Sequence, residues 1–317
     1  MKNPIVWQLP MRRVLYALAP IAIASVYFFG WRSLVVLAVV NLAGFLAEFV
    51  FTRFTKEKVT SAVFVTSFLF ALSLPPTIPL WIAVVGVAFG VVFGKMVFGG
   101  FGRNVFNPAL VGRVFVYVSF AVAMGDKWVE PLTPATGWLK LPSVWGGFTR
   151  FAADTVSGAT PLKLLRGGDS VDFLPLLWGN VSGSLGETSA ILIVLCGLYI
   201  VWKKAANWRI VVSGLGAFAI MQAIFWLTGV RHAADPLTAL VSGSTLLGIF
   251  FMATDPVSAA QTKGGRWIYG ALVGALIVLI RTFAIWPEGT MFAILLGNTF
   301  APIFDYVVRQ RAAKAKP

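Results

Sequence analysis

One short polar segment in the middle of the chain carries residues suited to covalent chemistry. Residues 154–160 read Asp-Thr-Val-Ser-Gly-Ala-Thr, so a threonine hydroxyl follows two small residues, with an acid upstream. Gly158 and Ala159 leave the backbone open beside Thr160, so a bulky phosphate-bearing group could approach this hydroxyl. Asp154 could orient that group or bind a metal that does. The segment therefore predicts an attachment site at Thr160.

Two alternatives are weighed against this prediction. Glycine, alanine, serine and threonine are ordinary loop residues, so the segment could be a surface turn without chemistry. A second hydroxyl, that of Thr136, also follows an alanine. It comes after Glu130 rather than an aspartate, and Pro134 stands where the flexible glycine would be. Thr160 is therefore the preferred hydroxyl.

The composition indicates a membrane protein. Hydrophobic residues make up 58% of the chain and charged residues only 12%, against about 25% in soluble domains. The net charge is +14, but the basic residues are dispersed between apolar runs, which fits membrane topology better than a nucleic-acid groove. Cys196 and His232 are the single residues of their kinds, so the chain alone cannot build a cysteine-only metal site or a bis-histidine haem site. No metal site is predicted.

Ten apolar runs are long enough to be helices that cross a bilayer, which predicts an all-α polytopic membrane protein with about ten transmembrane helices. Pro75 and Pro76 cut the third run short and favour a broken helix. Five runs lie in residues 1–124 and five in 186–308, with a connecting loop at 125–185 and a basic tail at 309–317. Because the halves would start from opposite sides, they are predicted to form an inverted repeat.

Charge distribution predicts the orientation. Lysine and arginine concentrate in cytoplasmic segments of membrane proteins, and most basic residues of this chain fall in segments that are cytoplasmic if the N-terminus is inside. The prediction is therefore that both termini are cytoplasmic. The connecting loop with Thr160 is then extracytoplasmic, where a covalent tether would keep a cofactor from being lost.

Two segments of the first half resemble two segments of the second half in sequence. Residues 104–110 (NVFNPAL) resemble 298–304 (NTFAPIF), and the stretch from Phe70 to Pro76 resembles that from Phe251 to Pro256. In both halves a proline interrupts an apolar run, which frees backbone carbonyls and exposes helix ends. Such groups bind ions and anionic cofactors in transporters.

Amides and glycines gather at residues 94–110. Asn104 and Asn107 are three residues apart and would lie on one face if a helix begins there. They could then hydrogen-bond the polar edge of a planar ring, while the glycines admit the ring against the backbone. The alternative is a helix cap with a tight loop.

Three acids lie in or beside apolar runs, where an ionisable residue is costly and suggests an ion path or a buried partner. Glu48 and Asp305 are the main candidates. The alternative is that each carboxylate reaches the inner boundary, near Arg53 and Arg309 respectively. Asp255 precedes a proline at a helix end, where capping is an equally good interpretation.

Further segments extend these motifs into a family resemblance. They are residues 251–259, 264–270, 286–289 and 301–306, which read FMATDPVSA, GGRWIYG, WPEG and APIFDY. With the motifs above, the chain resembles the NqrB/RnfD family, a membrane flavoprotein shared by two ion-pumping complexes. NqrB belongs to the sodium-pumping NADH:quinone oxidoreductase, and RnfD belongs to the Rnf ferredoxin:NAD oxidoreductase. The resemblance covers about residues 40 to 308.

The resemblance implies cofactors for specific residues. Thr160 would carry FMN as a phosphoester made by a flavin transferase, and Asp154, Ser157, Gly158 and Ala159 would complete the attachment motif.

Asn104 and Asn107 match amides that face a second, non-covalent flavin, riboflavin, near the cytoplasmic side. Glu48 and Asp305 match membrane acids linked to cation uptake, and Gly44 falls at the quinone site of the quinone reductase. Asp255 is grouped with them as a candidate on the ion or quinone pathway.

The implied function is electron relay coupled to Na+ or H+ export across the bacterial inner membrane. Partners would be the other subunits of the complex, including a second covalent-FMN subunit and iron–sulfur subunits, with NAD or quinone as acceptor. The short N-terminus favours the Rnf type, whereas residues 266–269 and 286–289 look closer to the quinone reductase, so subtype, ion and acceptor stay open. The rival interpretations are a secondary transporter or channel without a redox cofactor, and a scaffold that has lost its cofactor.

Overall fold

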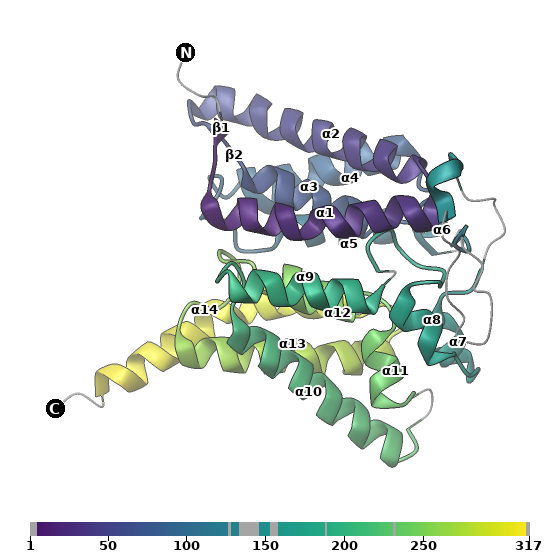
Figure 1. The fold of residues 1–317 in the computed structure, drawn as a ribbon. Coiled ribbons are helices and arrows are strands. Elements are labelled where there is room, and N and C mark those ends of the chain that lie inside the picture. The colour runs from purple at the N-terminus through teal and green to yellow at the C-terminus, as the bar shows by residue number, and fades with distance from the viewer. Residues whose placement is uncertain are drawn as a thin grey trace.

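The computed structural model describes residues 5–125, 128–132, 146–152, 158–187, 189–230 and 233–314, and most of these residues are helical. Figure 1 shows two groups of roughly parallel helices, one above the other, joined by a connecting segment at one end. The only sheet in the described part is a parallel pair, β1 (Ile5–Val6) and β2 (Val59–Thr60). The predicted all-α polytopic class is confirmed.

The helices of the first half are α1 (Leu9–Phe29), α2 (Arg32–Thr55), α3 (Ala62–Leu72), α4 (Leu80–Val91), the π-helical turn η1 (Val92–Met96) and α5 (Pro108–Ser119). The connecting segment holds α6 (Ala121–Gly125), the 3-10 turn η2 (Gly146–Thr149), α7 (Pro161–Gly167) and α8 (Phe173–Trp178). The second half holds α9 (Ala190–Trp202), α10 (Trp208–Leu227), α11 (Pro236–Val241), α12 (Thr245–Leu247), the π-helical turn η3 (Gly248–Met252), α13 (Lys263–Phe283) and α14 (Thr290–Lys314).

Five helices of the described part are long and apolar enough to cross a membrane, namely α1, α2, α10, α13 and α14. The other predicted spans appear as shorter apolar helices or as broken ones. The third run ends as α3 at Leu72, just before the two prolines, as the sequence predicted. Its counterpart in the second half is interrupted between α11 and α12 at Gly243, where φ is +65°.

The packing of the helices recurs between the halves. In the first half α2 packs on α3 and α4, α1 packs on α3, and α5 packs on α3 and α4. In the second half α10 packs on η3 and α13, α9 on α12, and α14 on η3 and α13. Helices α1 and α9 lie side by side and run in opposite directions (Figure 1). This arrangement supports the predicted inverted repeat.

At the end of each broken helix, backbone carbonyls accept hydrogen bonds from residues that are distant in the sequence. The carbonyls of Leu72 and Leu74, at the end of α3, accept hydrogen bonds from the backbone N–H groups of Gly186 (2.6 Å) and Leu185 (3.0 Å). These donors precede α9. At the end of η3, the Met252 carbonyl accepts a hydrogen bond from Asn107 Nδ2 at 3.1 Å. Free carbonyls that apolar surroundings would leave unsatisfied are thereby paired.

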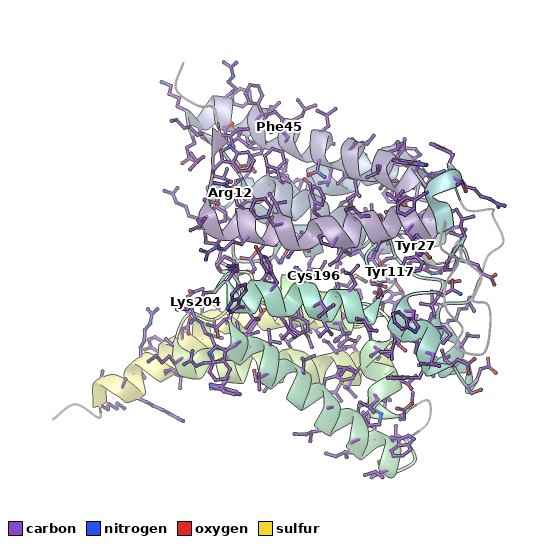
Figure 2. The ribbon with its side chains drawn as sticks, in the orientation of Figure 1. Arg12, Tyr27, Phe45, Tyr117, Cys196 and Lys204 are labelled. Carbon is purple, nitrogen blue, oxygen red and sulfur yellow. The ribbon has the colours of Figure 1, made fainter. Side chains whose placement is uncertain are left out.

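Both termini lie at one end of the bundle and the connecting segment lies at the other (Figure 1). In Figure 2, Arg12 and Lys204 mark the end with the termini, whereas Tyr27 and Tyr117 lie toward the connecting segment. The segment is fixed to the first half where α1 meets α2, because the N–H groups of Trp31 and Arg32 donate to the carbonyls of Arg150 and Phe151.

Small residues let helices of each half approach closely. A Cβ at Gly274 of α13 would overlap the carbonyl oxygen of Gly214 of α10, and a Cβ at Gly90 of α4 would lie 2.5 Å from the carbonyl oxygen of Pro108. Close approach at small residues is the usual basis of helix packing in membranes, because lipid removes the hydrophobic drive between helices.

The substitution Gly274→Ala should therefore separate α10 from α13 and lower stability by about 1–3 kcal/mol, the usual cost of overpacking. Gly216→Ala is the matched control, because a Cβ at Gly216 of α10 meets no atom within 4 Å. Thermal unfolding in detergent should show a lower midpoint for Gly274→Ala only. Equal midpoints for the two variants would contradict this account of the packing.

Candidate functional site

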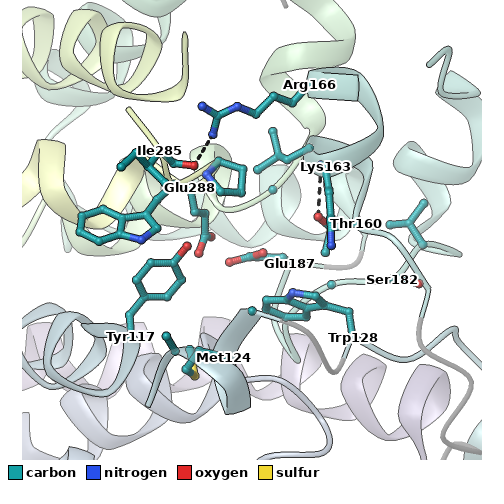
Figure 3. Close-up of a pocket in the computed structure, with 18 of the residues that line it drawn as sticks. Tyr117, Met124, Trp128, Thr160, Lys163, Arg166, Ser182, Glu187, Ile285 and Glu288 are labelled. Carbon is teal, nitrogen blue, oxygen red and sulfur yellow. Dashed lines mark hydrogen bonds between the residues drawn. The ribbon is translucent and has the colours of Figure 1, made fainter. Parts of the chain in front are cut away.

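A cavity of about 490 Å³ lies between the connecting segment and the ends of both halves (Figure 3). It is called the Thr160 cavity here. Its wall includes residues of α5, α6, α7 and α8 and of the loops before α9 and α14, among them Tyr117, Met124, Trp128, Thr160, Lys163, Arg166, Ser182, Glu187, Trp286 and Glu288. The volume falls within the range of about 300–1,000 Å³ typical of small-molecule sites.

Thr160 is held at the cavity wall by its position at the start of α7. It is the N-cap residue, and its Oγ1 accepts a hydrogen bond from the Lys163 backbone N–H at 3.3 Å. Pro161 follows at the first helical position, where its missing N–H costs nothing. The side chain is half-buried, so the predicted attachment hydroxyl borders a space that could hold a ligand.

Helix α7 is fastened to the second half. Arg166 Nη1 donates to the carbonyl of Ile285 at 2.7 Å, and Nη2 donates to the carbonyl of Ala284. Leu162 packs against Gly243, where a Cβ would overlap its side chain. The position of Thr160 is therefore set by the break between α11 and α12 and by the loop after α13.

The remaining residues of the attachment motif are placed in part. Gly158 donates its N–H to the Trp128 carbonyl at 2.8 Å, and a Cβ there would overlap Ser182 Oγ. Glycine at position 158 thus lets the two loops pack closely without displacing the Ser182 side chain. Ala159 is exposed. Asp154 and Ser157 lie outside the described residues.

Aromatic side chains form part of the wall. The rings of Tyr117 and Trp286 meet edge to face with centroids 6.0 Å apart, and Trp286 stacks on Phe292 at 5.2 Å. Trp128 lies on the opposite side of the view in Figure 3. Flat apolar surfaces of this kind can pack against a planar ring system.

Two buried carboxyl groups that the sequence analysis did not select as site residues also line this cavity. Glu288, in the loop between α13 and α14, forms an ion pair with Arg113 of α5 at 2.6 Å. Glu187, in the loop before α9, lies beside Glu288, and Figure 3 shows the two carboxyl groups next to each other. Arg281 lies nearby but donates to the carbonyls of the α11–α12 region. An acid between apolar runs was the available signal, and Glu288 also stands in the WPEG motif.

The pKa values of the two carboxyl groups are shifted in opposite directions. Burial raises the pKa of Glu187 well above its usual value, and the charge of Glu288 raises it further against the opposing charge of Arg113. Burial also opposes ionisation of Glu288. However, the charge of Arg113 and hydrogen bonds with Glu187 and Ser244 outweigh it and lower the pKa of Glu288 to about 2.

Asn104 and Asn107 are both buried but do not share a helical face. The helix begins at Pro108 and not at Asn104, because Asn107 is its N-cap and proline occupies the first helical position. Asn107 Oδ1 accepts from Ala109 N–H, and Asn104 Nδ2 donates to the carbonyl of Phe106. The cap-and-loop alternative therefore describes the local structure.

A second, small cavity of about 40 Å³ is lined by Asn104, Asn107, Lys95 and Asp255. It is far below the size range of cofactor sites. Asp255 Oδ1 accepts from the N–H groups of Val257 and Ser258, so it caps a turn, as the alternative interpretation held. A ring the size of a flavin would need these side chains to move.

Glu48 is buried in an ion pair rather than directed to the membrane boundary. Its Oε2 lies 2.6 Å from Lys95 Nζ, and its Oε1 accepts from the N–H and hydroxyl of Thr60 at 2.9 Å each. The structure thus gives Glu48 a partner other than Arg53. Gly44, one turn earlier, packs against α3, where a Cβ would overlap Ser67 Oγ.

Asp305 is also held by internal hydrogen bonds. Its Oδ1 accepts from Thr262 N–H at 2.8 Å and from the Thr262 hydroxyl at 2.6 Å, and its Oδ2 accepts from Gln261 N–H at 2.7 Å. The carboxylate therefore ties α14 to the start of α13. Glu48 and Asp305 each order a loop at a helix terminus, and their predicted cation role stays a prediction.

The fold and the site together define a polytopic helical membrane protein with a cofactor-sized cavity at the end opposite its termini. The chain belongs to the NQR2, RnfD, RnfE family, whose model matches residues 2–314. It is similar to the D subunit of the ion-translocating oxidoreductase complex of Salmonella paratyphi A, at 36% identity over 326 residues. The same-named protein of Yersinia enterocolitica is 37% identical over 325 residues. Each comparison covers 95% of this chain and 92% of the relative.

The substitution Lys95→Met should strongly destabilise the protein, because it leaves the Glu48 carboxylate buried without its cation. Breaking a buried pair from one side costs about 3–5 kcal/mol, whereas replacing both partners is often close to neutral. The double variant Lys95→Met/Glu48→Gln should therefore recover much of the lost stability in a thermal unfolding assay. Lys58→Met, at an exposed lysine, is the control. A single variant as stable as the parent would contradict a structural role for the pair.

Proposed function

We propose that the chain is the membrane subunit of an ion-translocating oxidoreductase complex and carries FMN esterified to Thr160. The observation that carries this proposal is the placement of the Thr160 hydroxyl in the wall of the 490 Å³ cavity. Family membership, and relatives named as the D subunit of an ion-translocating oxidoreductase complex, support the same function. Bound there, the flavin would supply one- and two-electron chemistry.

The residues present fit such a group. Thr160 offers the hydroxyl for the phosphoester, and Lys163 and Arg166 place positive charge in the same wall, which suits a phosphate. Tyr117 and Trp286 offer aromatic surface for the ring system. Gly158 and Ser182 pack the loop before Thr160 and so fix its approach to the cavity. The chain's own part is to bind, orient and enclose the cofactor.

The wider assignment follows from this site. Both termini are proposed to be cytoplasmic in a bacterial inner membrane, which would place the Thr160 cavity on the extracytoplasmic side. Maturation would require a flavin transferase, and the partners would be a second covalent-FMN subunit and iron–sulfur subunits that exchange electrons with NAD or quinone. Glu48, Asp255, Asp305 and Gly44 remain candidates for the ion or quinone pathway.

A riboflavin site near Asn104 and Asn107 is proposed only with rearrangement. Both amides are already engaged in the fold, and the adjoining cavity is about 40 Å³. A neighbouring cavity of about 360 Å³ shares Asp255 and Pro256 with it, so a modest shift of this turn would enlarge the space.

A transporter without a redox cofactor is the second candidate, favoured by the helix packing that recurs between the halves and by the two broken helices. The two functions differ in one observable. A flavin that survives denaturation fits only the redox function.

Covalent attachment is tested by in-gel flavin fluorescence after denaturing electrophoresis of protein coexpressed with a flavin transferase. The parent should show a fluorescent band, and Thr160→Ala should abolish it, because no hydroxyl remains for the phosphoester. Thr160→Ser should retain some label.

Two controls separate chemistry from folding. Thr160→Asn keeps a good N-cap side chain but offers no hydroxyl, so it should be as dark as Thr160→Ala while remaining folded. Thr299→Ala removes an exposed hydroxyl outside the cavity wall and should stay fluorescent. Absence of a band from the correctly exported parent would refute the FMN assignment.

A further inference from the structure

Glu187 and Glu288 line the Thr160 cavity but have no part in holding a phosphoester at Thr160. Both are at least nine-tenths buried, with 9% and 8% of their surface exposed. Each also has one carboxyl oxygen, Oε1, without a hydrogen-bond partner among the described residues. Figure 3 shows the two carboxyl groups next to each other and beside the Tyr117 hydroxyl, directed toward the cavity. Most buried polar atoms are hydrogen-bonded, so these two oxygens are available to a group bound in the cavity.

The two acids differ in how close their nearest positive charge lies. Arg113 Nη2 contacts Glu288 directly, at 2.6 Å, whereas no cation in the described part forms an ion pair with Glu187. The guanidinium of Arg281 is committed to the carbonyls of Ala239 and Ser242. Glu187 therefore feels positive charge only at longer range.

Two neighbouring buried carboxyl groups disfavour simultaneous ionisation, so one of them keeps a proton. Glu288 is the ionised partner because it pairs with Arg113, so Glu187 is the protonated one. Burial and the negative charge of Glu288 both favour the protonated form of Glu187, and the raised pKa of this group agrees. The backbone holds Glu187 in place, because the neighbouring Gly186 N–H donates a hydrogen bond to the Leu72 carbonyl at the end of α3.

We propose that Glu187 and Glu288 form a proton-exchange site of the Thr160 cavity, in which Glu187 holds a proton and releases it to a bound group that gains negative charge. The identity of that group as FMN rests on the proposed function. One O–H bond breaks on Glu187, and one bond to the same proton forms on the bound group. The electrons come from a flavin or iron–sulfur centre of a partner subunit, and none passes through the carboxyl pair.

The groups that face the pair suit this exchange. Arg113 and Arg281 stabilise the second carboxylate that release of the proton creates, and solvent reaching the cavity restores the proton. Tyr117 from α5 and Lys163 and Arg166 from α7 line the same space, so the negative charge forms in a wall that also holds cations. The proton is thus stored beside the cavity without leaving two bare carboxylates in contact.

Infrared spectroscopy of the full chain in lipid nanodiscs tests the proposal, because a protonated carboxylic acid has a carbonyl band distinct from that of a carboxylate. At neutral pH the parent should show a band equivalent to one acid per chain, which Glu187→Gln removes. Glu187→Asp should keep a shifted band, which separates loss of the acid from misfolding. Glu57→Gln, at an exposed glutamate, should leave the band unchanged.

Reduction of the FMN-loaded protein should diminish or shift this band in the parent and in Glu57→Gln, with no change at that position in Glu187→Gln. The proposal is overturned if the parent has no protonated band, if Glu187→Gln retains it, or if reduction leaves it unaltered. Failure of flavin attachment is seen separately, as a protein band without flavin fluorescence in the gel. The unloaded protein, titrated with pH, still shows whether Glu187 holds the proton.

Discussion

The structure depends on one constraint, which is that a helix that stops inside apolar surroundings must find partners for its last carbonyl groups. An unsatisfied backbone group in such surroundings costs several kcal/mol. At the end of α3 the partners are the N–H groups of Leu185 and Gly186. At the end of η3 the Met252 carbonyl accepts from the Asn107 amide, in addition to a longer bond from the Asp255 N–H. In each case a distant segment supplies a partner, so separating these segments would remove it.

The same hydrogen bonds position the site. Because Leu185 and Gly186 are bonded to α3, Glu187 is fixed at the floor of the Thr160 cavity, next to Glu288 and Arg113. Helix α7 is fixed from the second half through Arg166. The cavity is therefore an assembly of both halves and the connecting segment, which explains how a short loop can hold the Thr160 hydroxyl in a defined place.

Several buried polar residues have structural partners of their own. Glu48 pairs with Lys95 and orders Thr60, and Asp305 orders Gln261 and Thr262. Asn107 donates its N–H to Asn298, which in turn donates to the Tyr269 hydroxyl. These contacts connect helix ends to loops, at the end of the bundle where the N- and C-termini of the chain lie. Any role in moving cations must therefore operate through groups that also hold the fold together.

The sequence by itself determined the all-α membrane class, the break before Pro75 and the family, and it singled out Thr160 as the predicted attachment residue, because hydropathy, proline chemistry and short motifs are local properties of the chain. Only the tertiary structure decided that helix α5 begins at Pro108 and that Glu48 is paired with Lys95. It also decided that Glu187 and Glu288 meet beside Thr160, although they lie 27 and 128 residues away from it in the chain. The physical reason is that burial and the pairing of charges are set by contacts between distant segments, which no local pattern encodes.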